Sequence, residues 1–243
     1  MKNKIFPPKA KKIPKTLVAH DDVRIDNYYW LNDRENQEVL DYLHAENKYT
    51  KQMMKHTEAF QEKLFEEMKA RIKEDDQSVP YKFNGYWYIT RFEKGKDYPI
   101  YSRKKETLEA PEELLFDCND MAKNHAYFKL GSISISPDNS LAAFSTDTVS
   151  RRQYIIQVKN LITGEIYPEK IKNTTGSVTW ANDNQTLFYS RKDKVTLRSN
   201  SICKHKLHTK VTEDVEVYHE EDETFNTFVY KTKSRKYIVI GSS

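Results

Sequence analysis

The sequence has few of the residues on which several protein classes depend. Only two of its 243 residues are cysteines, Cys118 and Cys203, which is too few for the disulfide framework of a small secreted domain. Only six glycines are present, so Asn, Asp and Pro must make most of the turns. No run of about 18 apolar residues could span a membrane, and no apolar segment follows the first lysines as in a secretory signal. We therefore expect a cytoplasmic protein without a membrane span.

The short motifs of common active sites are also absent. The sequence has no phosphate-binding loop, no Rossmann glycine pattern and no paired C-x-x-C. Gly131-Ser132 and Gly176-Ser177 lack the flanking residues of the G-x-S-x-G nucleophile pattern, and Gly241-Ser242 stands at the end of the sequence. We predict no catalytic, cofactor-binding or metal-binding residue in this chain, and no cofactor.

Positive charge is concentrated at the start of the chain. Six lysines precede the first acidic residue, Asp21, and the remaining sequence has 34 basic and 36 acidic side chains: the six are Lys2, Lys4, Lys9, Lys11, Lys12 and Lys15. A nucleic-acid-binding arm would interleave arginines and aromatic residues with the lysines. This arm has no arginine and no repeated aromatic residue, so we predict a solvated arm and no nucleic-acid partner. A contact with another polyanion is the alternative.

Two groups of residues have some character of a catalytic or metal site. Cys203, His205 and His208 are close in sequence, but on a strand only the first two share a face. Ordinary strand residues are therefore favoured over a zinc site. His20-Asp21-Asp22 could supply two members of a triad, yet no nucleophile accompanies it at a defined spacing, so a polar turn is favoured.

We expect the acidic runs to be solvent-exposed loops and the aromatic runs to pack in the core. The runs 74–76 and 220–223 could attract basic peptides by their field, but such runs are more often solvated loops. Tyr86, Trp87, Tyr88 and Trp180 lie in strand patterns, where packing in the core is expected.

The order of patterns along the chain predicts a helical part followed by strands. Pro7, Pro8 and Pro14 indicate an extended arm over residues 1–31. Apolar residues at helical spacing then predict two helices or one broken helix over 34–73, beginning at an Asn32-Asp33 N-cap. Asn84-Gly85 predicts a hairpin turn. The predicted strands are 79–83, 86–92, 100–103, 114–116, 133–136, 141–145, 154–161, 178–180, 187–190, 203–207, 215–218, 228–232 and 237–240.

A turn followed by a strand occurs twice at a fixed distance. Asp138, in the sequence S-P-D-N, precedes an apolar run that ends at Ser145, and Asp183, in A-N-D-N, precedes one that ends at Ser190. Both pairs are 45 residues apart in the numbering. A repeat of this length is typical of a β-propeller blade. Grouped in fours, the predicted strands make about three blades and the start of a fourth.

Several boxes resemble the prolyl oligopeptidase family of serine peptidases. The first is D-N-Y-Y-W-L-N-D at 26–33, which is similar to the box that opens family members. The likeness is closer to the oligopeptidase B branch, also called protease II, in the following segments: 71–80, 85–88, 95–101, 136–138, 180–183, 187–189 and 217–225. The resemblance covers essentially all 243 residues.

This resemblance implies part of a two-domain peptidase. In the family, an N-terminal helical segment packs on a C-terminal α/β-hydrolase domain, and a seven-bladed propeller gates access of short peptides to the active site. The oligopeptidase B branch cleaves after Arg or Lys with a Ser-Asp-His triad. All three triad residues belong to the C-terminal domain, so none can be carried over to this sequence.

We therefore expect a mainly β fold with an N-terminal helical segment and an incomplete propeller. Residues 1–76 would be the arm and the helices that pack on the catalytic domain, and residues 77–243 the partial propeller. The implied function is the N-terminal portion of a serine oligopeptidase that takes short basic peptides, with this part inactive without the missing α/β-hydrolase domain. The alternative is a stand-alone propeller-like module for protein interaction.

Overall fold

The chain folds as two compact units, residues 1–73 and 74–243. The computed structural model describes residues 6–243, so Lys2 and Lys4 of the predicted arm lie outside the described residues. The expected boundary between 76 and 77 would divide a short strand, β3 (Asp76–Gln77), that pairs within the second unit. No helix of the described residues is both long and apolar enough to cross a membrane.

The first unit begins with a β-hairpin, so the expectation of an extended arm over 1–31 was wrong for part of that range. Strands β1 (Lys15–Ala19) and β2 (Asp22–Asp26) pair in antiparallel register. Their turn residues, His20 and Asp21, both have positive φ, at 49° and 64°. Such a turn is usually signalled by Asn or Gly. Because neither Asn nor Gly stands at these positions, the hairpin has no clear turn signal in the sequence.

One broken helix follows, as predicted. A short 3-10 helix, η1 (Tyr29–Asn32), precedes α1 (Gln37–Met54), and η2 (Lys55–Thr57) separates α1 from α2 (Glu58–Ala70). The N-cap of α1 is Asn36, whose side chain accepts a hydrogen bond from the Glu38 amide, and not Asn32-Asp33 as expected. The break has a local cause, because the Thr57 hydroxyl donates to the Met54 carbonyl at 2.7 Å and competes with the helical pattern.

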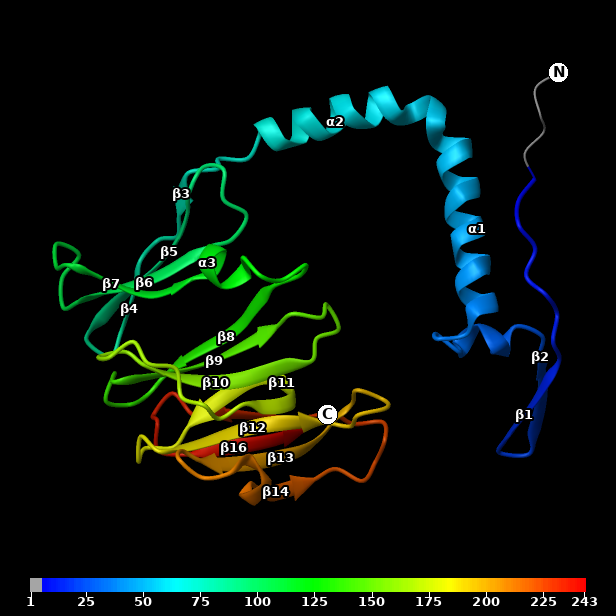
Figure 1. Cartoon of the computed structure of the whole chain (residues 1–243). Helices are drawn as coiled ribbons and strands as arrows, with labels where there is room; N and C mark the ends of the chain where they lie inside the picture. Colours follow the sequence, from blue (N-terminus) through cyan, green and yellow to red (C-terminus); the bar gives the residue numbers. More distant parts are fainter. Residues whose placement is uncertain (1–5) are drawn as a thin grey trace. The chain divides into compact units, whose positions relative to one another are not determined.

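The second unit consists of antiparallel sheets arranged as successive propeller blades (Figure 1). The first blade contains β3, β4 (Tyr81–Phe83), β5 (Tyr86–Phe92), β6 (Ile100–Lys105) and β7 (Glu112–Asp117). After α3 (Cys118–Ala122), the second contains β8 (Lys129–Ile135), β9 (Leu141–Asp147), β10 (Tyr154–Asn160) and the start of β11 (Ile171–Trp180). The third blade contains the end of β11, β12 (Thr186–Lys192), β13 (Ser199–Lys206) and β14 (Val215–His219), with η3 (Val211–Glu213) before β14. Strands β15 (Thr227–Lys231) and β16 (Ile238–Ser242) begin a fourth. The expected partial propeller is confirmed.

Strand β11 belongs to two blades and joins them into one seven-stranded sheet. Its first half pairs with β10 and its second half with β12, with an irregularity in both registers near Thr174. Gly176 lies at this bend with φ of 90°. A Cβ there would lie 2.7 Å from Cγ of Tyr154, so the bend requires glycine for both its backbone and its packing.

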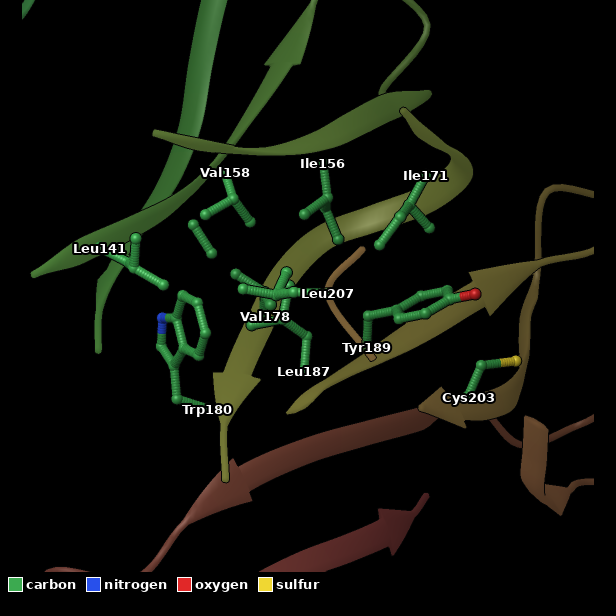
Figure 2. Packing of buried hydrophobic residues seen from close by; sticks show 11 residues of the cluster. Leu141, Ile156, Val158, Ile171, Val178, Trp180, Leu187, Tyr189, Cys203 and Leu207 are labelled. Atoms are coloured by element: carbon green, nitrogen blue, oxygen red, sulfur yellow. The ribbon is translucent and has the colours of Figure 1, made fainter. Parts of the chain in front are cut away.

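The core lies between the blades. One cluster joins the second and third blades, and Figure 2 shows Ile156 and Val158 of β10 facing Val178 and Leu187. A second cluster joins the first and second blades, where Phe116 of β7 lies 4.8 Å from Phe144 of β9 between ring centroids. Neighbouring blades therefore bury apolar residues against each other.

Candidate functional site

The repeat found in the sequence forms equivalent turns between the first and second strands of successive blades, here called A–B turns. In the second and third blades the turns contain Asn139 and Asn184, with φ of 65° and 57°. The first blade has the shorter Asn84-Gly85 turn, confirmed as predicted, and Asn84 has φ of 49°. The fourth turn, 232–237, places Arg235 at the same position with φ of 58°.

In the second and third A–B turns, an aspartate accepts hydrogen bonds from residues of its own turn. The Asp138 carboxylate accepts hydrogen bonds from the Ser136 hydroxyl at 2.5 Å and from the Ser140 amide at 3.0 Å. Asp183 accepts in the same way from the amide and hydroxyl of Thr186. Burial raises the pKa of both carboxyls, but these hydrogen bonds outweigh it and hold each pKa below its ordinary value.

Hydrogen bonds link each A–B turn to the next. Asn84 Nδ2 donates to the Asn139 Oδ1 at 2.9 Å, and the Asp138 amide donates to Asn184 Oδ1 at 3.0 Å. Asn182 Nδ2 donates to the Arg235 carbonyl at 3.0 Å. Arg235 then donates from Nη1 to Oδ1 of Asn84, also at 3.0 Å, which connects the fourth turn back to the first.

The first, second and fourth of these turns border a pocket of about 410 Å³ at the ends of the first strands of the blades. Four different blades contribute to it, because its walls come from β4, β8, β11 and β15 and from the turns that follow β4, β8 and β15. The lining residues are Phe83, Asn84, Ser134, Ile135, Ser136, Pro137, Val178, Thr179, Trp180, Lys231, Thr232, Lys233 and Arg235. This axial pocket is the candidate functional site.

Cys203 and His205 are separated from His208 in the structure. The first two are buried on β13, as their alternation predicted, whereas the His208 ring is exposed and packs against Tyr167 at 4.9 Å. His205 Nδ1 lies 2.6 Å from Asp214, whose other oxygen accepts from the Tyr189 hydroxyl at 2.8 Å. Among residues 6–243 no group of three or more His, Cys, Asp and Glu side chains could hold a metal ion.

The two buried cysteines and Tyr189 are poor nucleophiles. Burial raises the pKa of the Cys203 thiol and, with the Asp214 hydrogen bond, that of the Tyr189 hydroxyl. Burial raises the pKa of Cys118 to about 12. Both thiols therefore stay protonated near neutral pH, and the thiolate is the nucleophilic form.

The remaining sequence candidates are turns, loops and core residues. His20 and Asp21 form the β1–β2 turn, so a polar turn is what the structure has there. The acidic run 220–223 is held by Arg198, which donates to the Asp222 carbonyl at 2.8 Å. Tyr88 and Trp180 are buried, as core packing predicted.

Tyr86 and Trp87 depart from that expectation by being only half-buried. The acidic residues at 74–76 are exposed, as expected of a loop, although Asp76 begins β3. Sequence reasoning missed the pocket cations Lys231, Lys233 and Arg235. Their signal was the fourth turn, at 232–237, which has the same length as the turns at 136–141 and 181–186 but a different composition. Its Ser234 follows Asp183 by 51 residues and not by 45.

Comparisons with known proteins identify this arrangement of blades. The family described as "Prolyl oligopeptidase, N-terminal beta-propeller domain" matches residues 7–243. Dipeptidyl aminopeptidase BI of Pseudoxanthomonas mexicana is 40% identical, over 97% of this chain and 35% of that protein. Protease 2 of Moraxella lacunata is 33% identical over the same shares.

Solved structures match as well. Oligopeptidase B from Leishmania major has 30% identity and a TM-score of 0.90, covering 99% of this chain and 36% of that one. This chain thus spans about 35% of the length of its curated relatives. Because the family match extends over nearly the whole sequence, the chain belongs to the prolyl oligopeptidase family and carries part of its N-terminal β-propeller domain.

Proposed function

We propose that this chain is the N-terminal portion of a serine oligopeptidase of the oligopeptidase B type. The complete enzyme would hydrolyse short peptides after Arg or Lys, through a serine nucleophile, a histidine base and an acyl-enzyme. The triad would lie in a C-terminal α/β-hydrolase domain, and this chain alone would be inactive. The observation that carries the proposal is the likeness to Leishmania major oligopeptidase B, at TM-score 0.90 over 99% of the chain.

The helical unit would supply a contact surface for that domain. Helix α2 has no buried residue, and its large apolar side chains are exposed. Those side chains are Phe60, Leu64, Phe65 and Met68. An exposed apolar patch of this kind marks an interaction site.

A dipeptidyl aminopeptidase activity is the second candidate. It is favoured by the 40% identity to dipeptidyl aminopeptidase BI, which is higher than the 33% identity to protease 2. The two candidates differ in the substrate end that they require, because only an aminopeptidase needs a free amino terminus.

A chimeric enzyme separates these candidates. This chain would replace the matched N-terminal part of Moraxella lacunata protease 2, and two fluorogenic peptides ending in Arg would be compared, one with a blocked and one with a free amino terminus. Comparable hydrolysis of the blocked peptide supports the oligopeptidase. Hydrolysis of the free peptide alone supports the aminopeptidase, and a folded, inactive chimera favours a stand-alone interaction module.

The contact surface is tested in the same chimera. Leu64→Glu is expected to lower peptide hydrolysis by at least about tenfold, since it introduces a charge into an apolar interface. Glu66→Lys, on the polar side of α2, is the matched control and should leave activity unchanged. Equal effects of both substitutions would contradict the assignment of the α2 face.

We also propose a cytoplasmic location, supported by Cys118 and Cys203, which are both buried free thiols. Fractionation of cells that express the chain from its own gene tests this. Recovery of the chain from the extracellular or envelope fraction would contradict it.

A further inference from the structure

The fourth A–B turn differs in charge from the two turns that it otherwise resembles. The second and third turns carry an aspartate one residue before the asparagine, whereas the fourth has Ser234 there. Lys233 and Arg235 flank this serine. Arg235 also has the left-handed φ of 58°, which asparagine tolerates far better than arginine. Strained backbone of this kind is concentrated at functional sites.

The change of composition makes the axial pocket cationic. Lys231, Lys233 and Arg235 line it, and no Asp or Glu is among the lining residues. Within residues 6–243, none of these three cations forms an ion pair. The nearby carboxylates of Asp138 and Asp183 accept hydrogen bonds from their own turns instead. The pocket therefore has positive charge with no anion inside it.

Arg235 is held at the pocket by two contacts that leave most of its donors available. Its Nη1 donates to Oδ1 of Asn84 at 3.0 Å, and its guanidinium lies over the Phe83 ring, 4.5 Å from the centroid. A guanidinium has five N–H donors in a planar fork that suits two parallel bonds to a carboxylate. The neutral Asn84 amide accepts only one of these.

Lys231 lies deeper in the same wall. Its Nζ donates to the Trp180 carbonyl at 2.8 Å, and an ammonium group has two further donors. Burial lowers the pKa of Lys231, Arg235 lowers it further, and Asp183 acts in the opposite direction. A second anionic group in the pocket would relieve the repulsion between these two cations.

We propose that the axial pocket binds a carboxylate carried on a small molecule with an apolar body, such as the C-terminal residue of a short peptide. Arg235 and Lys231 would bind the carboxylate, and Phe83, Val178 and Trp180 supply apolar wall. The volume of about 410 Å³ lies within the range of small-molecule sites. The apolar wall favours an organic carboxylate over free phosphate. This binding does not depend on the peptidase assignment, so either proposal can fail without the other.

Calorimetric titration of the 243-residue chain tests the proposal. The ligands are N-acetylphenylalanine, its neutral amide as the matched control, and inorganic phosphate. We expect the acid to bind at least about tenfold more tightly than the amide, because only the acid offers a charged acceptor to Arg235 and Lys231. Arg235→Gln should weaken binding of the acid at least about tenfold, whereas Arg235→Lys should retain part of it.

Lys236→Gln is the matched variant, because it removes one positive charge from the same turn but does not line the pocket. It should leave binding of the acid nearly unchanged, and circular dichroism melting should be alike for all variants. The proposal is overturned by equal binding of acid and amide, by equal loss in Arg235→Gln and Lys236→Gln, or by no binding of the acid at about 10 mM. Tighter binding of inorganic phosphate than of the acid would also overturn it.

Discussion

The cluster between the first and second blades contains an aromatic pair, Phe116 and Phe144, which are 3% and 1% exposed. Phe144→Ala removes a ring that buries about 150–200 Å², which at about 25 cal/mol per Å² corresponds to about 4–5 kcal/mol. Measured Phe→Ala substitutions in cores cost about 3–5 kcal/mol. We therefore expect the free energy of unfolding to fall by about 3–5 kcal/mol in urea denaturation.

A double-mutant cycle isolates the contact between the two rings. Phe116→Ala alone should cost a similar amount, and the coupling between the two substitutions should be about 0.5–1.5 kcal/mol, as for other aromatic pairs. Lys159 also lies over the Phe116 ring, 5.2 Å from its centroid, so the Phe116 variant loses this contact too. The cycle subtracts that loss, because it occurs whether or not Phe144 is present.

Phe92→Ala is the control in the same unit, since Phe92 is 41% exposed. It should cost at most about half as much as Phe144→Ala. A cost below about 1 kcal/mol for Phe144→Ala, or a coupling of zero, would refute the idea that blades are held together by burial against their neighbours.

Three further predictions concern backbone, pH and thiols. Gly176→Ala should lower the melting temperature clearly, because its φ is 90° and the new Cβ would meet Tyr154 at 2.7 Å; an unchanged melting curve would contradict the described bend. The pKa of Asp183 in the folded chain is lower than the ordinary 3.8. Its ionised carboxylate therefore stabilises the fold above pH 3.8, and this stabilisation is lost as the pH falls through the folded-state pKa. Asp183→Asn should therefore reduce stability at about pH 7 and progressively less as the pH falls below 3.8, and a pH-independent loss would count against the hydrogen-bonded carboxylate. Cys118, with a pKa of about 12, should not react with a thiol reagent at neutral pH until the chain unfolds, and rapid modification of the native chain would argue against its burial.

Strands were predictable where the local signal and the packing agree. The aromatic run after Asn84-Gly85 predicted β5 over its full length, and both turn residues have the positive φ that such a turn requires. Strand β11 was predicted only at 178–180, whereas it begins at Ile171. The missing part is polar and contains Gly176, and it is ordered by pairing with β10, a tertiary interaction that local sequence does not reveal.

The candidate site was less predictable than the fold. The aspartates at 138 and 183 marked two A–B turns, but the pocket depends on the fourth turn, which lacks that aspartate. Arg235 occupies a backbone conformation for which arginine has no preference, so its position follows from strand pairing between β15 and β16. Residues of four blades line the pocket, so it exists only when the sheets are assembled, and local sequence patterns do not predict it.

We propose that this chain is part of a peptidase whose catalytic residues lie outside it. The most direct measurement is the rate at which the purified 243-residue chain releases the fluorophore from a blocked, Arg-ended peptide. We expect no release above the buffer blank. Hydrolysis that co-purifies with the chain and is abolished by a serine-directed fluorophosphonate would contradict it.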